Sequence, residues 1–234
     1  MNEDLLKEGA TKLGVDLTAS QLHKFSIYLK TLLLWNKKVN LTAITDEKDV
    51  VVKHFLDSLA ALKAFPMSGG TVVDIGAGAG FPGLPIAIAC PGISLTLIDS
   101  VRKKTEFLHH LASLLSLHSV DVVWGRAEDL AKEMRERFDA SFSRAVAPLN
   151  VLAEYSLPFL KVHDIMVALK GKEIEKELES CEHALATLGG EIKDVVKVRL
   201  PGTDIARNIV LVEKTSVTPE KFPRRAGMAE KKPL

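Results

Sequence analysis

The spacing of apolar residues along the chain changes near residue 70. Before that point apolar positions recur at the spacing of a helix, and Thr18 followed by Gln21 forms a capping box that predicts a helix start. A second helical stretch is expected from Glu47 to Ala64, where the breakers Ser68-Gly69-Gly70 follow shortly after. The first part of the chain is therefore expected to be helical.

After Thr71 short apolar runs alternate with segments of helical period. This alternation is typical of right-handed strand–helix–strand crossovers, which produce a parallel sheet with helices on both faces. The five expected strands are 71–75, 94–98, 120–124, 140–143 and 165–169.

Two later apolar runs, 194–200 and 208–213, lie too close together for a helix between them, and Pro201-Gly202 falls in their connection. We expect them to form an antiparallel pair at one edge of the sheet. The predicted fold class is thus α/β. The expected organisation has three segments: an N-terminal helical extension (1–66), a ligand-binding α/β domain (67–216) and a basic C-terminal tail (217–234).

Composition indicates an ordinary globular protein. Of the 234 residues, 47% are hydrophobic and 26% charged, enough for one sizeable core. The N-terminus is acidic, and no apolar run approaches the roughly 18 residues of a membrane span. Cys90 and Cys181 are far apart, which gives neither a disulfide framework nor a zinc pattern. We expect a cytoplasmic protein with no membrane segment and no metal site.

The net charge of +1 gives no overall field for a polyanion, so nucleic-acid binding would need a local basic patch. The segment 222–234 offers one, since Arg224, Arg225, Lys231 and Lys232 face only Glu230 as an acid. Composition alone favours a solvated, partly disordered tail for this segment. A second basic group, Arg102-Lys103-Lys104, lies in the first turn of an expected helix, where the helix dipole disfavours cations. This placement fits RNA-phosphate binding and a solvated helix face equally well.

Three alternate glycines, Gly76, Gly78 and Gly80, follow the first expected strand. Glycine lets the backbone turn tightly and approach a ligand with no side chain in the way. The free N–H groups of the following helix point to the same place. The arrangement predicts a nucleotide or nucleoside site rather than a packing turn.

The identity of that ligand is less constrained, because Gly78, Gly80 and Gly83 also match the dinucleotide pattern G-x-G-x-x-G. Asp74, at the end of the strand, would repel a pyrophosphate but attract the ammonium of a methionine moiety, directly or through water. The expected C-terminal hairpin is absent from two-halved dinucleotide folds. Both features favour S-adenosylmethionine as cofactor, with a nicotinamide-dependent oxidoreductase as the alternative.

Acidic residues follow the second and third expected strands. Asp99 is placed to accept hydrogen bonds from both ribose hydroxyls, a role shared by dinucleotide and S-adenosylmethionine sites, or to cap the next helix. Ala127-Glu128 would meet an adenine edge if the sites follow the order of the strands. Glu128 fits equally well as a first-turn residue favoured by the dipole of the next helix.

Four segments together resemble the bacterial glucose-inhibited division protein B family, over essentially the whole chain. Members of that family methylate N7 of one guanine in 16S ribosomal RNA, on the RNA or the small subunit. The segments are the turn Asp74–Gly83, His54-Phe55-Leu56-Asp57-Ser58, Ser143-Arg144-Ala145-Val146-Ala147, and the tail from Phe222-Pro223-Arg224-Arg225 to Lys232-Pro233-Leu234.

The resemblance implies a class I methyltransferase fold, with a seven-stranded Rossmann-like sheet and helices at its N-terminal side. It also implies contacts to S-adenosylmethionine from Gly76, Phe81, Ala127-Glu128 and Arg144. Because guanine N7 has a free lone pair and no proton, in-line transfer to it needs no general base. The catalytic residues therefore remain unassigned.

Arg144 is a charged residue at the carboxyl end of the fourth expected strand, beside the expected cleft. We expect it to contact the cofactor and to help position the guanine or a phosphate, the alternative being a structural ion pair. The groups Arg102 to Lys104 and Arg224, Arg225 and Lys231 are expected to hold the RNA backbone. A competing hypothesis is a ribosome-assembly RNA-binding protein that holds the cofactor without turnover.

Overall fold

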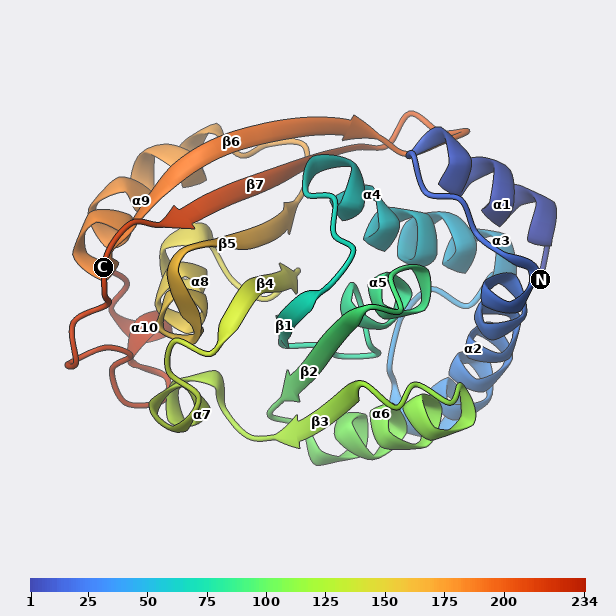
Figure 1. Ribbon diagram of the computed structural model, residues 1–234, viewed down its shortest axis with the longest axis horizontal. Helices are drawn as coiled ribbons and strands as arrows, with labels where there is room; N and C mark the ends of the chain where they lie inside the picture. The colour runs from blue at the N-terminus through green and yellow to red at the C-terminus, as the bar shows by residue number, and fades with distance from the viewer.

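The computed structural model describes residues 1–234, with seven strands in one mixed sheet (Figure 1). The strand order is β3-β2-β1-β4-β5-β7-β6. Strands β1 to β5 pair in parallel, and β7 is antiparallel to both of its neighbours, β5 and β6. The predicted seven-stranded fold with a C-terminal hairpin is confirmed. The strands are β1 (Gly70–Ile75), β2 (Ile93–Asp99), β3 (Val120–Trp124), β4 (Phe138–Arg144), β5 (Leu160–Lys170), β6 (Gly190–Arg199) and β7 (Ala206–Lys214).

Strand β5 departs most from its prediction, because it begins at Leu160 rather than at Ile165. Its pairing with β4 shifts register between Phe138 and Ala140, and His163 has a φ of 76°. After the buried Leu160, residues 161–164 alternate between exposed and half-buried positions in this irregular stretch. The apolar run therefore marks only the half of the strand that the core buries.

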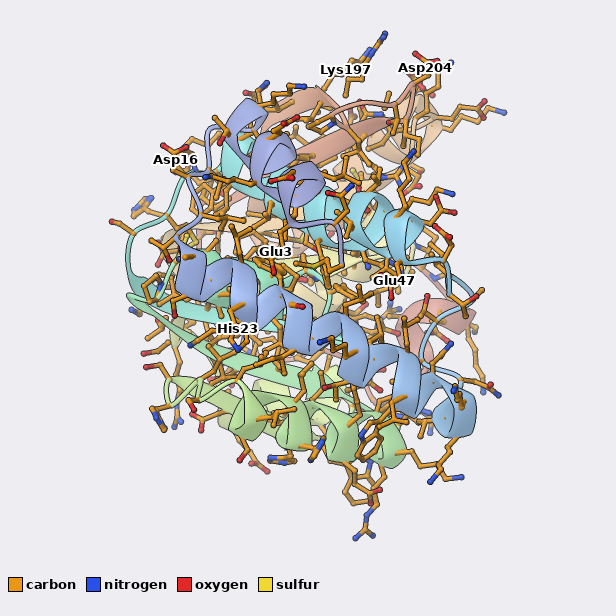
Figure 2. The ribbon with its side chains drawn as sticks, turned by 90° about the vertical axis from the view of Figure 1, so that its right-hand side faces the viewer. Glu3, Asp16, His23, Glu47, Lys197 and Asp204 are labelled. Atoms are coloured by element: carbon orange, nitrogen blue, oxygen red, sulfur yellow. The ribbon has the colours of Figure 1, made fainter.

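Helices cover both faces of the sheet. On one face a core of 42 buried residues joins the N-terminal helices to α5, α6 and the sheet. Figure 2 looks onto this side, where α1 and α2 lie in front of the sheet. The other face carries α7, α8, α9 and α10 over a second core of 24 residues. The helices are α1 (Glu3–Lys12), α2 (Ala19–Val39), α3 (Glu47–Val50), α4 (Asp57–Ala64), α5 (Gly83–Ala89), α6 (Arg102–Leu114), α7 (Ala127–Glu133), α8 (Leu149–Ser156), α9 (Glu175–Leu188) and α10 (Met228–Lys231).

The capping box at the start of α2 is present: the Thr18 backbone N–H donates to Gln21 Oε1 at 2.8 Å, and the Gln21 N–H donates to Thr18 Oγ1 at 3.3 Å. Because the first core contains residues of both the N-terminal helices and the sheet, these helices contribute to the packing of the sheet. The division of the chain near residue 66 stays a prediction.

The expected helix 47–64 contains a π-helical segment, η1 (Val51–Leu56), between α3 and α4. The wider π turn contains His54 and is followed directly by Asp57. Single π turns are rare inside α-helices and occur often at functional sites. Periodicity alone predicts one uninterrupted helix here.

The last residues pack against the protein instead of forming the solvated, partly disordered tail that composition favours. Phe222 and Ala229 are buried, and the Arg135 guanidinium donates to the carbonyls of Phe222 and Thr218. We call residues 218–234 the C-terminal strap. No helix in the structure has the length and apolar character needed to cross a membrane.

Candidate functional site

The glycine-rich turn after β1 requires glycine on steric grounds. Gly76, Gly78 and Gly80 have φ values of 70°, 59° and 94°. A Cβ added at Gly76 would lie 2.8 Å from Val146 Cγ2, so a side chain there would collide with the loop after β4. The turn thus brings backbone N–H groups close to the carboxyl ends of β1 and β4, where parallel sheets bind ligands.

Asp74 lies beneath this turn and is fully buried. Its Oδ2 accepts from the Gly83 N–H at 2.7 Å, while Oδ1 has no hydrogen-bond partner. Burial raises the pKa of the Asp74 carboxyl to about 7. Asp74 lines neither of the two hollows described below, so its attraction for the ammonium of the cofactor stays a prediction.

A hollow of about 120 Å³ at the carboxyl ends of β1, β2 and β3 brings together Gly76, Asp99, Ala127 and Glu128. We call it the cofactor hollow. Asp99 accepts from the Gly78 N–H and from the Val101 N–H, each at 2.8 Å. A carboxylate has about four acceptor positions, so further hydrogen bonds to a ribose remain available to it.

The C-terminal strap forms one wall of the cofactor hollow. Glu230 lines the hollow, and the hydroxyl of Tyr155 donates to its Oε1 at 3.2 Å. The buried Glu128 carboxylate accepts from the Gly227 N–H at 2.8 Å, which ties the strap to the start of α7. Sequence analysis missed both Tyr155 and Glu230, because they lie 75 residues apart and carry no local motif.

A larger cleft of about 740 Å³ adjoins the cofactor hollow, and Val146 lines both. Arg144 reaches into its wall, with its NH1 donating to Asp57 Oδ2 at 3.0 Å and to the Lys53 carbonyl at 3.1 Å. The guanidinium carbon stands 4.9 Å from the centroid of the Phe81 ring. The Phe81 ring is buried and lines neither hollow, so its contact with the cofactor stays a prediction.

Asp57 links two arginines across this cleft. Its Oδ1 accepts from Arg207 Nε at 2.7 Å, while its other oxygen binds Arg144. Only 3% of the Asp57 side chain is exposed. Arg207 comes from β7, 150 residues away in sequence, and was not predicted as a site residue. The sequence signals for this cluster were the family motif around His54 and Asp57 and the position of Arg144 at the end of the fourth expected strand.

His54 completes the wall of the cleft. Its ring stacks on Phe81 with 4.4 Å between centroids, and Nε2 lies 2.8 Å from Thr42 Oγ1. Burial, together with the positive charge of Arg144, lowers the pKa of His54 from 6.5 to about 4. The ring is therefore neutral at neutral pH.

This pKa predicts acid sensitivity. The unfolded chain binds a proton at His54 near pH 6.5 but the folded chain only near pH 4, so the contribution of His54 to stability is present above pH 6.5 and is lost between pH 6.5 and about 4. The His54→Gln variant should lose this part of the pH dependence of unfolding in urea. An NMR titration of the His54 ring with a midpoint near 6.5 would contradict the prediction.

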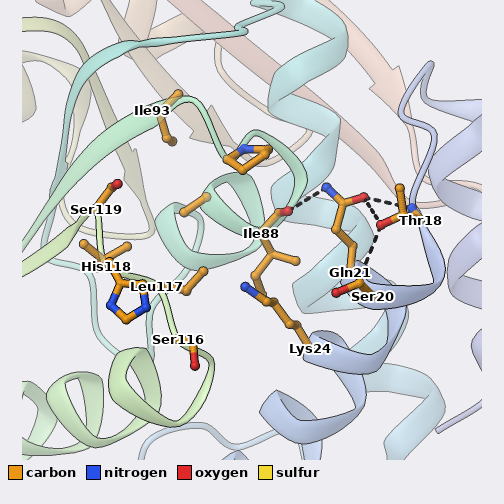
Figure 3. A pocket seen from close by; sticks show the side chains of 13 residues that line it. Thr18, Ser20, Gln21, Lys24, Ile88, Ile93, Ser116, Leu117, His118 and Ser119 are labelled. Carbon is orange, nitrogen blue, oxygen red and sulfur yellow. Dashed lines mark hydrogen bonds between the residues drawn. The ribbon is translucent and has the colours of Figure 1, made fainter.

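A further hollow lies at the opposite end of the sheet (Figure 3). Its volume is about 420 Å³, and its lining includes Ile93 and Val120, which begin β2 and β3. Gln21 spans part of it by donating to the Ile88 carbonyl at 2.8 Å. It lies at the amino ends of the strands, so it belongs to neither the cofactor hollow nor the cleft.

The basic residues predicted to hold RNA fall into two groups. Arg102, Lys103, Arg225 and Lys231 are exposed, and Lys104 is half-buried. Arg224 is different, because its Nε and NH2 donate to the Glu154 carboxylate and its NH1 donates to the Lys232 carbonyl. These bonds form a structural ion pair and engage three of its five N–H donors, so the contact of Arg224 with RNA stays a prediction.

The mixed sheet with an antiparallel β7, the glycine turn and the acceptor at Asp99 fit an adenosyl cofactor and define a class I S-adenosylmethionine-dependent methyltransferase. The fold differs from that of a nicotinamide-dependent oxidoreductase by the antiparallel β7. The family described as GidB, rRNA small subunit methyltransferase G, matches residues 21–210, and the chain belongs to this family.

Relatives match over almost the full chain. The ribosomal RNA small subunit methyltransferase G of Alkaliphilus oremlandii is 47% identical, covering 99% of this chain and 98% of that protein. The protein of the same name from Lactobacillus johnsonii is 46% identical, with 100% of both chains covered.

Solved structures support the fold alone. A methyltransferase from Pyrococcus furiosus aligns with a TM-score of 0.58 at 17% identity, covering 80% of this chain and 96% of that one. M. jannaschii TYW2 in complex with AdoMet aligns with a TM-score of 0.53 at 16% identity, covering 64% of this chain and 71% of that one.

Proposed function

We propose that this protein methylates N7 of a specific guanine in 16S ribosomal RNA, in the cytoplasm, by direct in-line transfer. Membership of the rRNA small subunit methyltransferase G family supports the choice of RNA. S-adenosylmethionine supplies an electrophilic methyl group. Gly76, Asp99, Ala127 and Glu128 would hold it in the cofactor hollow, and the acceptor base would enter the adjoining cleft past Val146.

The observation that carries the choice of N7 is that both carboxylates lining the cleft are already paired with cations. Asp57 is held by two arginines, and Glu177 by Lys170 at 2.7 Å and by the Leu149 N–H at 3.0 Å. The pKa of His54 is lowered to about 4, which makes it a weak base. Such a cleft suits an acceptor that has a lone pair and no proton to lose.

The residues of the cleft would therefore act by orientation. Arg144 and Arg207 would present fixed guanidinium donors to a guanine oxygen or a phosphate. The Ala145–Pro148 loop lines the cleft, and its Val146 also lines the cofactor hollow. Ala145 has a φ of 56°, a conformation that bends the loop sharply after β4. Well-oriented reactants gain roughly 7 to 11 kcal/mol over free encounter, enough for a large rate enhancement without acid–base chemistry.

A labelled-methyl assay tests this function. Small subunits and naked 16S RNA from cells lacking the gene would each be incubated with the protein and labelled S-adenosylmethionine. We expect label at one guanine, with borohydride reduction and aniline cleaving the RNA there because N7-methylguanine is labile to them. Label at a position resistant to this cleavage would exclude N7. Tight binding of cofactor and RNA without transfer would instead support the assembly protein that holds its cofactor without turnover.

A further inference from the structure

Trp124 is a large apolar side chain left in solvent at the edge of the sheet. It is the last residue of β3, the outermost strand on that side (Figure 1), and is 59% exposed. Its indole Nε1–H donates to the Ser100 carbonyl at 3.0 Å. The hydrogen bond fixes the orientation of the ring while the ring stays exposed, as is typical of aromatic residues at interaction sites.

A cationic side chain lies beside this ring. The Arg102 guanidinium carbon lies 5.7 Å from the ring centroid, and exposed Lys103 follows it. No acidic residue lies in the first turn of α6, although its dipole disfavours cations there. Arg102 has one ion-pair partner, Glu106, whose exposed carboxylate lies 3.4 Å from Arg102 Nε and is screened by solvent. The group Trp124, Arg102 and Lys103 is therefore aromatic and cationic.

The group also lies at the rim of the cofactor hollow. Ser100, which accepts the indole hydrogen bond, lines the hollow, and so does Gly125, which follows Trp124 in the chain. The cofactor hollow adjoins the cleft through Val146, so this rim lies on the side of the sheet at which the target base would enter. Exposed aromatic rings combined with arginine are the elements with which proteins bind single-stranded nucleic acid.

We propose that Trp124 is a stacking platform for an unpaired base of the RNA substrate, with Arg102 and Lys103 neutralising the adjacent phosphates. This rests on the proposed function for the identity of the polymer. Such a platform differs from a patch that binds only phosphates, because the indole stacks on the flat face of a base and adds affinity that salt does not screen. Stacking on one aromatic residue is worth roughly 1–3 kcal/mol, or about 5- to 150-fold in affinity.

The experiment compares Trp124→Ala, Trp124→Phe, Lys103→Gln and the unmodified protein. Each would be titrated with a labelled single-stranded RNA of about 12 nucleotides at several salt concentrations. We expect Trp124→Ala to weaken binding at least about fivefold at every salt concentration with an unchanged slope, and Trp124→Phe to restore most of the affinity. Lys103→Gln should lower the slope by about one. Trp124→Ala and the unmodified protein should bind a ribose-phosphate oligomer that lacks bases with equal affinity.

Equal RNA affinity of Trp124→Ala and the unmodified protein would overturn the proposal. So would a loss confined to S-adenosylmethionine binding in calorimetry, because Trp124 would then be a wall of the cofactor hollow. The binding measurement does not depend on methyl transfer. If Trp124 contributes to RNA binding but no methyl group is transferred, the proposed function is contradicted and the stacking role of Trp124 is still supported.

Discussion

Replacing Arg144 by alanine should lower methyl transfer at least about tenfold, which corresponds to about 1.4 kcal/mol of transition-state stabilisation. The expected loss follows from the place of Arg144, on the wall of the cleft beside Val146, which also lines the cofactor hollow. The fold should survive the change, because Asp57 keeps Arg207 as its partner at 2.7 Å and is not left as an unpaired buried charge.

Two measurements separate positioning from a purely structural role. The midpoint of urea unfolding should change little in Arg144→Ala, while initial rates of labelled-methyl transfer fall. Arg144→Lys keeps the charge but cannot donate to Asp57 and the Lys53 carbonyl with one planar group, so it should recover only part of the activity. Near-normal turnover of Arg144→Ala would show that the arginine serves only as an ion pair.

Replacing Arg224 by alanine should destabilise the protein by about 3–5 kcal/mol. Glu154 is only 1% exposed, and its carboxylate accepts from Arg224 Nε at 2.9 Å and NH2 at 2.6 Å. Without the guanidinium this buried carboxylate would lose its counter-charge and keep only the hydrogen bond from the backbone N–H of residue 224, at 2.8 Å. The strap would also loosen where Gly227 and Glu230 meet the cofactor hollow, so calorimetry should show weaker binding of S-adenosylmethionine.

The neighbouring arginine gives a matched control. Arg225 is exposed and has no ion-pair partner in the structure, so Arg225→Ala should alter the unfolding free energy by no more than about 0.5 kcal/mol. Its effect should be seen in RNA binding, as a lower salt slope. If the two variants unfold at the same urea concentration, the buried ion pair contributes nothing to the attachment of the strap.

The parts of the site that sequence predicted are those in which chemistry is local. The alternate glycines of the turn, Asp99 at the end of β2 and the Ala127-Glu128 pair are each specified by a strand end and the residues next to it. Gly76, Asp99 and the Ala127-Glu128 pair line the cofactor hollow, whereas the other two alternate glycines do not. The buried central strands could also be predicted from the sequence, because a strand that is buried on both faces needs a continuous apolar run.

The missing parts depend on contacts between distant segments. The Asp57–Arg207 pair joins residues 150 apart, and the Arg224–Glu154 pair joins residues 70 apart. Counting charges in the tail treated Arg224 as a free cation. Such a count includes the basic residues of the tail but cannot detect their pairing with a buried carboxylate on α8. The π turn at His54 was also invisible, since a π turn inserted in a helix leaves the apolar pattern on either side intact.

The C-terminal strap has a consequence for the order in which the cofactor hollow is completed during synthesis. Glu230, which walls the hollow, is translated after the glycine turn and after all seven strands. A growing chain that has already produced β1 to β5 therefore still lacks this wall, and any copy terminated before Glu230 lacks it altogether.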